Sequence, residues 1–170
     1  MTWRRKLGAS LLPAALWAQA TYEPPPEQLP RVVPAQPVAF SHKAHMDQRM
    51  ACTDCHPGAA RAERAGVPQR DDCMVCHQAI ATDNAAVREL AAMAPGSRIR
   101  WERVYQVPDY VFFSHGEHSR AGLDCVTCHG PVASRTVLDQ EISTNMVACM
   151  NCHAERKASV ECFLCHDLGQ

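Results

Sequence analysis

The hydrophobic residues of this chain form one long run near the N-terminus and only short runs after it. Residues 7–18 are mostly apolar, with Pro13 among them; three basic residues precede them and the small-x-small tripeptide 18–20 follows. A run of about a dozen residues is too short to span a hydrocarbon core of about 30 Å. The pattern predicts a signal peptide over residues 1–20, cleaved after Ala20, and export to the periplasm; an uncleaved signal anchor is the alternative.

The remaining sequence alternates between short helix-like segments and stretches rich in proline or polar residues. Six of the twelve prolines fall within residues 22–37, which predicts an extended linker over residues 21–39. Residues 83–93 predict a helix, with Asn84 or Asp83 at its start as the N-cap and Pro95-Gly96 after it as the stop. Residues 104–113 suggest a short extended segment. We expect a mostly α fold with extensive loops and little sheet.

Composition places the 170-residue chain among globular proteins, with room for one domain or two small ones. Its 46% of hydrophobic and 21% of charged residues exclude disorder. Aromatic residues make up only 6%, so a conventional packed core is not expected and another component is needed to fill the interior. Loss of residues 1–20 removes three of the 17 basic residues and none of the 18 acidic ones, so the remaining chain has a net negative charge. This charge argues against binding to nucleic acid, for which a clustered basic face is expected.

Ten cysteines fall into five C-x-x-C-H motifs with none left over. In this motif two thiols can add to the two vinyl groups of one heme, and the histidine becomes the proximal ligand of the iron. The sequence therefore predicts five covalently attached heme c groups. The motifs are Cys52, Cys55 and His56 (motif 1), Cys73, Cys76 and His77 (motif 2), Cys125, Cys128 and His129 (motif 3), Cys149, Cys152 and His153 (motif 4), and Cys162, Cys165 and His166 (motif 5).

Three other uses of paired cysteines fit less well. Structural zinc uses four ligands per ion, so ten cysteines would leave one pair unmatched, and no histidine need follow each pair. A disulfide scaffold suits an exported chain with an even cysteine count but does not explain the five histidines. Thioredoxin-like redox pairs would require a βαβ context, and five of them in one short chain have no evident purpose.

The four histidines outside the motifs are also patterned. Residues 40–45 read F-S-H-K-A-H and residues 113–118 read F-S-H-G-E-H, and residues 40–56 match 113–129 at a constant offset of 73, which indicates an internal duplication. If each segment is one helical turn, its two histidines lie about 5–6 Å apart and cannot straddle one heme. We expect each pair to reach two different hemes as sixth ligands, surface histidines being the alternative. These residues are His42, His45, His115 and His118.

Five irons with two axial ligands each need ten ligands, but the chain has nine histidines. At least one iron is therefore expected to differ from the others. Methionine is the leading substitute and would raise the potential of that heme. Met146, three residues before motif 4, is the first choice, ahead of Met46, Met50 and Met93. An open coordination site is the other possibility.

The two F-S-H-x-x-H segments, each followed by C-x-x-C-H, resemble the class III multiheme cytochromes c, the cytochrome c3 and c7 group. This resemblance covers about residues 40–166 and implies that His42 serves the heme of motif 1 and His115 that of motif 3, with the second histidine of each pair reaching elsewhere. Residues 101–130 resemble the pentaheme subunits of quinol-oxidising membrane complexes such as alternative complex III, in which a methionine matching Met146 is common. Those subunits often keep a membrane anchor, which this chain is not expected to retain.

These observations predict a pentaheme domain over residues 40–170, with a two-heme half at 40–77, a connector at 78–112 and a three-heme half at 113–166. The predicted function is a periplasmic c-type cytochrome that carries electrons between respiratory redox partners, including a quinol-oxidising membrane complex. No small-molecule substrate and no catalytic residue is predicted. The alternative is a small multiheme reductase or ligand sensor that uses the one heme without two histidines.

Overall fold

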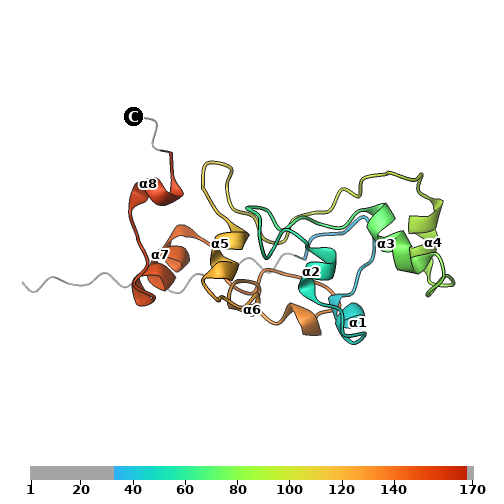
Figure 1. Cartoon of the computed structure of the whole chain (residues 1–170). Coiled ribbons are helices and arrows are strands. Elements are labelled where there is room, and N and C mark those ends of the chain that lie inside the picture. The colour runs from blue at the N-terminus through green and yellow to red at the C-terminus, as the bar shows by residue number, and fades with distance from the viewer. Residues whose placement is uncertain (1–32, 168–170) are drawn as a thin grey trace, which may run out of the picture.

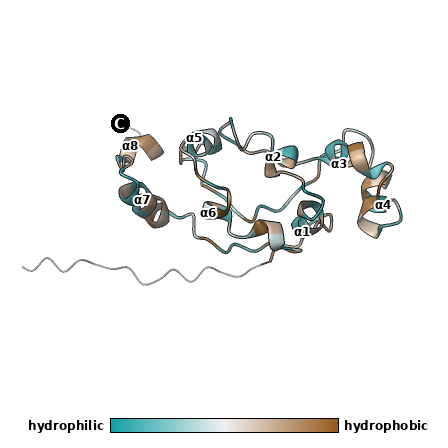
Figure 2. Ribbon diagram, turned by 60° about the horizontal axis from the view of Figure 1, so that its bottom comes forward, coloured by the Kyte–Doolittle hydropathy of each residue, from teal (hydrophilic) through white to brown (hydrophobic). Residues whose placement is uncertain are grey.

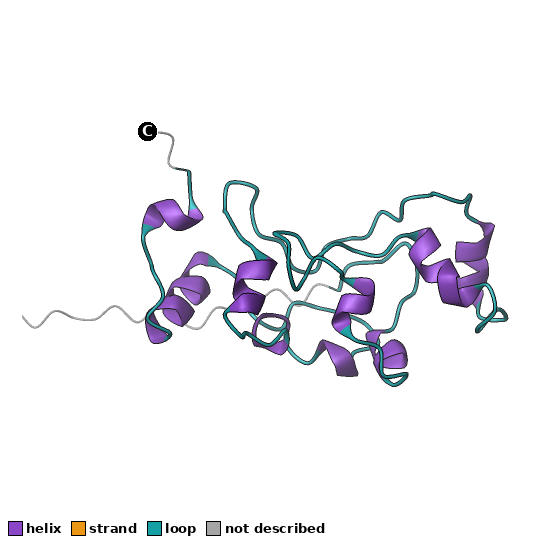
Figure 3. Ribbon diagram, in the orientation of Figure 1, coloured by secondary structure: helices purple, strands orange, loops and turns teal. Residues whose placement is uncertain are grey.

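Short helices joined by loops are the regular elements of the computed structural model, which describes residues 33–167. The predicted signal peptide and residues 21–32 of the predicted linker lie outside this range. Within it there is no β-strand, only an isolated antiparallel bridge between Val111 and His166 (Figure 3). None of the helices in the described range is long and apolar enough to cross a membrane. The helices are α1 (His42–Met46), α2 (Cys52–Cys55), α3 (Arg70–His77), α4 (Ala85–Ala92), α5 (His115–Arg120), α6 (Val126–His129), the 3₁₀ helix η1 (Val132–Ser134), α7 (Met146–Glu155) and α8 (Cys162–Cys165).

The two F-S-H-x-x-H segments each begin a helix, as their spacing predicts. Ser41 is the N-cap of α1 and its side chain accepts a hydrogen bond from the Ala44 amide, while Ser114 does the same for α5 through the Glu117 amide. A serine oxygen at this position satisfies an amide that the first helical turn leaves unpaired. The histidine after each serine is therefore fixed at the first helical position.

The predicted helix at residues 83–93 corresponds to α4, which begins after its N-cap Asn84 and ends at Ala92. The side chain of Asn84 accepts a hydrogen bond from the Ala86 amide, which supports this start. The segment expected to be extended at residues 104–113 is an irregular loop, and only its Val111 pairs with another segment. The predicted class, mostly α with extensive loops, holds for the described residues.

The helices that carry the motifs lie in a row, and the order along this row differs from the order in the chain. Figure 1 shows α3, α2, α6, α7 and α8 following one another along the molecule, so the motif order is 2, 1, 3, 4, 5. Thiols of neighbouring motifs in this order lie close enough for one to raise the pKa of the other. These neighbours are Cys55 and Cys76, Cys52 and Cys125, Cys128 and Cys152, and Cys149 and Cys165.

Motifs 1 and 3 meet at the middle of the row through a reciprocal exchange of backbone hydrogen bonds. The Lys43 amide of α1 donates to the Arg135 carbonyl over 2.9 Å, and the Gly116 amide of α5 donates to the Ala62 carbonyl over 2.8 Å. Both donors and both acceptors are related by the offset of 73 residues found in the sequence. The two copies of the duplicated segment therefore contact each other as the protomers of a two-fold symmetric dimer do.

Among residues 33–167, hydrophobic side chains are buried only near one end of the row. They are Val38, Val87, Leu90 and Ile99, and three of these cluster between α4 and the segments beside motif 2. At the opposite end Phe163 and Leu164 of α8 are 61% and 59% exposed, and hydrophobic residues colour both α4 and α8 in Figure 2. Protein side chains alone thus leave most of the row without a core, as the low aromatic content predicts.

The segment that follows α4 contacts motifs from both predicted halves. The Ile99 amide donates to the Gln69 side chain beside motif 2, the Tyr105 hydroxyl donates to the His129 carbonyl of motif 3, and the Phe112 amide donates to the Cys165 carbonyl of motif 5. This segment, which the sequence predicts to be a connector, therefore also contacts motifs 2, 3 and 5 along the row. The division into a two-heme and a three-heme half stays a prediction.

We predict that Gly116→Ala destabilises the protein. Alanine normally favours a helix by about 1 kcal/mol over glycine. At this site, however, a Cβ would lie 2.7 Å from the Arg61 carbonyl carbon and 3.0 Å from the Ala62 nitrogen. Overpacking of this kind costs about 1–3 kcal/mol. Denaturant unfolding measures the loss in free energy of unfolding. The control is Ser119→Ala, at an exposed position on the same helix. An unchanged or increased stability of Gly116→Ala would contradict this close contact.

Candidate heme sites

All ten motif cysteines are free thiols in the structure. Within residues 33–167 no group of three or more histidine, cysteine, aspartate or glutamate side chains is arranged to hold a metal ion. Burial raises the pKa of Cys73 and Cys128, and the neighbouring Asp72 and Cys152 respectively raise it further, so both sulfurs stay protonated at pH 7. A structural zinc site needs four ligands close together, and the described range shows no such preformed group.

The histidines of the duplicated segments face the histidines of the motifs. An ion bound about 2 Å from one nitrogen of each of two imidazoles would hold the ring centroids about 6 Å apart. Three pairs of rings have this spacing. The centroid separations are 5.9 Å for His45 and His77 of motif 2, 6.3 Å for His115 and His129 of motif 3, and 6.1 Å for His118 and His153 of motif 4.

His42 lies near His56 of motif 1. Burial, and then the charges of His56 and His45, lower the pKa of His42 to about 4. Burial, and then His115 and His56, also lower the pKa of His129. Since a lowered pKa means that the ring loses its proton at lower pH, the His42 ring is neutral at pH 7. Neutral imidazole is the form that binds a metal.

Backbone carbonyls fix the orientation of six of these rings. A carbonyl oxygen can only accept, so the Nδ1 atom that contacts it carries the proton and the Nε2 lone pair is left for a metal. Both histidines at the second position of the duplicated turn use the carbonyl four residues earlier. The contacts are His45 to Ser41 at 2.8 Å, His118 to Ser114 at 2.7 Å, His115 to Glu63 at 2.9 Å, His56 to Gly66 at 2.7 Å, His77 to Ile80 at 3.0 Å and His153 to Ser159 at 2.7 Å.

Motif 5 has a different environment. Each of the four histidines outside the motifs lies near the histidine of motif 1, 2, 3 or 4, which leaves His166 without a histidine opposite it. The Tyr110 ring lies 6.1 Å from the His166 ring, tilted by 30°, and Val111 forms the isolated bridge with His166. The histidine count predicts that at least one site differs from the others, and motif 5, at the end of the row, is the motif whose histidine has no outer histidine beside it.

Met146, the predicted substitute ligand, is the first residue of α7 and lies one turn before Cys149. Its side chain is 61% exposed. Burial raises the pKa of Cys149, and the thiols of Cys128 and Cys165 raise it further, so this part of α7 lies beside motif 5 as well as motif 3. Ligation by Met146 stays a prediction.

Sequence reasoning missed the two tyrosines that accompany motif histidines. Tyr105 packs its ring 4.7 Å from the His129 ring and holds the His129 carbonyl, and Tyr110 lies beside His166. Both belong to the segment between the duplicated copies, whose sequence carries no periodic pattern. Both tyrosines lie shortly before the second F-S-H-x-x-H segment, which places them near a motif. Sequence spacing does not show which motif each tyrosine approaches.

Two comparisons show which known proteins this sequence resembles. The sequence model of the family described as cytochrome c7 and related cytochrome c matches residues 38–93 and residues 111–167. These two ranges contain the two copies of the duplicated segment. The multiheme cytochrome c subunit of a menaquinone reductase from Nitratidesulfovibrio vulgaris (strain Hildenborough) is 32% identical over 161 residues, which cover 77% of this chain and 76% of the relative.

We predict that His118→Ala opens one coordination position, opposite His153. The reduced variant should bind carbon monoxide at one more heme per chain than the unsubstituted protein, because alanine supplies no axial ligand. A carbon monoxide titration followed by absorbance measures the stoichiometry, with Ser119→Ala, the next residue of α5, as the control. Equal stoichiometry in the two variants would show that His118 is not an axial ligand.

Proposed function

The chain belongs to the cytochrome c7 and related cytochrome c family, and we propose that it carries single electrons along a row of five heme c groups. Family membership implies covalently bound heme and electron transfer in respiration. A bound heme supplies an iron that gains and loses one electron. The observation that carries the proposal is the row of motifs, in which every motif has its neighbour's thiol within electrostatic reach.

The protein's own contribution is to occupy axial positions and to hold the motifs close together. The facing histidines at motifs 2, 3 and 4 and the nearby His42 at motif 1 would leave no position there for a substrate, which favours electron transfer over catalysis. Short helices place two cysteines and a histidine on one turn, and the reciprocal bonds between the two copies join motifs 1 and 3. Carbonyl contacts at Nδ1 fix the ring planes and raise the basicity of the ligands.

We propose a periplasmic location and a quinone-linked membrane complex as partner. The predicted signal peptide supports export. The proposed heme attachment and redox role are consistent with a location outside the cytoplasm. The relative named as a subunit of a menaquinone reductase supports a partner that exchanges electrons with a quinone. In this arrangement the chain needs no substrate pocket of its own and receives or delivers electrons at the ends of the row.

A second candidate function follows from motif 5, whose His166 has no histidine opposite it. If that iron has an open position, the protein is a small reductase or a ligand sensor. If Met146 fills the position, the protein is an electron carrier throughout, and this heme has a higher potential than the others. We favour Met146 because Cys149, one turn further along α7, lies close to Cys165 of motif 5.

The heme count tests the central proposal. Protein isolated from a host that attaches heme c should contain five hemes per chain by pyridine hemochrome assay and by intact mass. Cys162→Ala combined with Cys165→Ala should remove one heme and leave four. A count other than five in the unsubstituted protein, or an unchanged count in the double variant, would overturn the pentaheme assignment.

The ligand of motif 5 is tested separately with Met146→Ala. The reduced unsubstituted protein should not bind carbon monoxide, whereas the variant should bind one molecule per chain and lose its highest-potential redox transition. Met150→Ala, a substitution on the same helix at a residue of similar type that is 44% exposed, should behave as the unsubstituted protein. Rapid binding by the unsubstituted protein would instead favour the reductase or sensor.

A further inference from the structure

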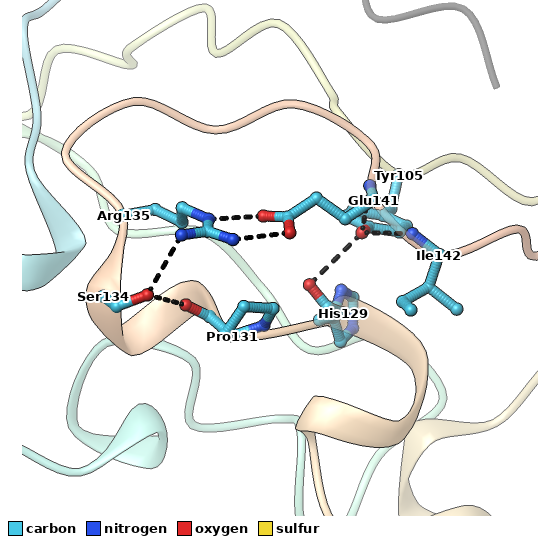
Figure 4. Close-up of polar contacts among 7 residues, drawn as sticks. All are labelled: Tyr105, His129, Pro131, Ser134, Arg135, Glu141 and Ile142. Atoms are coloured by element: carbon cyan, nitrogen blue, oxygen red, sulfur yellow. Dashed lines mark hydrogen bonds and ion pairs between the residues drawn. The ribbon is translucent and has the colours of Figure 1, made fainter.

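Tyr105 lies at motif 3, in the middle of the row, and binds it in two ways. Its ring centroid is 4.7 Å from that of His129, with the planes at 75°, so the two rings meet edge to face. Its hydroxyl contacts the His129 carbonyl at 3.2 Å (Figure 4). The side chain, which is half-buried, therefore contacts both the imidazole and the backbone of the proximal histidine.

The same hydroxyl also holds the far end of the loop that follows motif 3. It accepts hydrogen bonds from the Glu141 amide at 3.0 Å and from the Ile142 amide at 3.3 Å. A phenol oxygen has one proton to donate and two lone pairs. The three contacts use all of this capacity, so the loop is closed onto His129 at a single oxygen atom.

An ion pair between two residues of the loop also closes it. The Arg135 guanidinium binds the Glu141 carboxylate through two contacts of 2.5 and 2.7 Å, and Arg135 also donates to the Ser134 hydroxyl at 3.3 Å (Figure 4). A bidentate pair of this kind has a defined geometry as well as a charge attraction. The Arg135 carbonyl accepts the Lys43 amide of α1, so the fastened loop also reaches the helix that carries His42 and His45.

The equivalent histidine of the first copy is held differently. His56 contacts the Gly66 carbonyl through Nδ1 at 2.7 Å, and the loop after it is closed by a bond of 2.9 Å from the Gly58 amide to the Ala65 carbonyl. The loop after His129 is longer and is closed by side chains. His129 of motif 3 thus contacts an aromatic side chain, whereas His56, its equivalent in the first copy, contacts a backbone carbonyl.

We propose that Tyr105 is the positioning residue for the proximal imidazole of motif 3 and sets the plane of that ring. The planes of His129 and His115 differ by only 5°, whereas those of His118 and His153 differ by 42° and those of His45 and His77 by 79°. Contacts behind a metal-bound histidine orient it and tune the metal. The proposal rests on the proposed heme at motif 3 but not on its electron-transfer partner.

Electron paramagnetic resonance of the oxidised holoprotein tests this role, because the angle between two axial imidazoles determines the spectrum of a low-spin iron. Tyr105→Phe keeps the ring and removes the hydroxyl. We expect the rhombic signal of the near-parallel pair to shift toward the type given by larger angles, by one iron per chain, while the other signals stay. Tyr110→Phe is the matched control, since Tyr110 also lies beside a motif histidine but makes no recorded hydrogen bond with a described residue.

A charge swap separates positioning from general stability. Glu141→Arg should shift the same signal, and Arg135→Glu combined with Glu141→Arg should restore it by reforming the pair. Thermal melts and the heme count are measured on every variant. Unchanged spectra for Tyr105→Phe and Glu141→Arg would overturn the proposal, and so would an equal change at every heme together with lower stability. A heme count below five without any change at motif 3 would instead count against the pentaheme assignment alone.

Discussion

The structure depends on one constraint: two imidazoles must face each other at a separation that admits a metal ion between them. Three pairs meet it, with ring centroids 5.9–6.3 Å apart. Serine caps start the turns that carry the outer histidines, carbonyl contacts leave Nε2 free, and short helices present each motif on one turn. Helices of four to ten residues are marginal on their own. The facing imidazoles therefore explain why such short elements occur at these positions.

Duplication explains how a row can be built with so little protein core. Each copy supplies a turn with two histidines, and the exchange between Lys43 and Arg135 and between Gly116 and Ala62 places the two copies about a pseudo-two-fold axis. Motifs 1 and 3 lie at the axis, with motif 2 outside one and motif 4 outside the other. The chain order is broken at this junction because each copy's inner motif must contact its equivalent.

Local chemistry made much of this predictable from sequence. The motif residues, the capped turns before His42 and His115, and the helix at residues 85–92 follow from spacing and capping rules that act within a few residues. The order of the motifs along the row, the partners of His45 and His118, and the contact of Tyr105 with His129 depend on chain segments tens of residues apart. No periodicity encodes such contacts, and the segment after α4 carries several of them without a repeating pattern.

The proposed position of the unusual site, at motif 5, follows from the duplication. Two copies of a turn with two histidines supply four outer ligands, and a symmetric unit of four motifs uses all of them. A fifth motif added beyond this unit must take its sixth ligand from another residue type or keep an open position. Motif 5 lies beyond motif 4 and has a tyrosine, not a histidine, beside His166. A ligand such as methionine there would raise the potential of the last heme, so an electron entering at motif 2 would lose free energy on reaching the opposite end of the row.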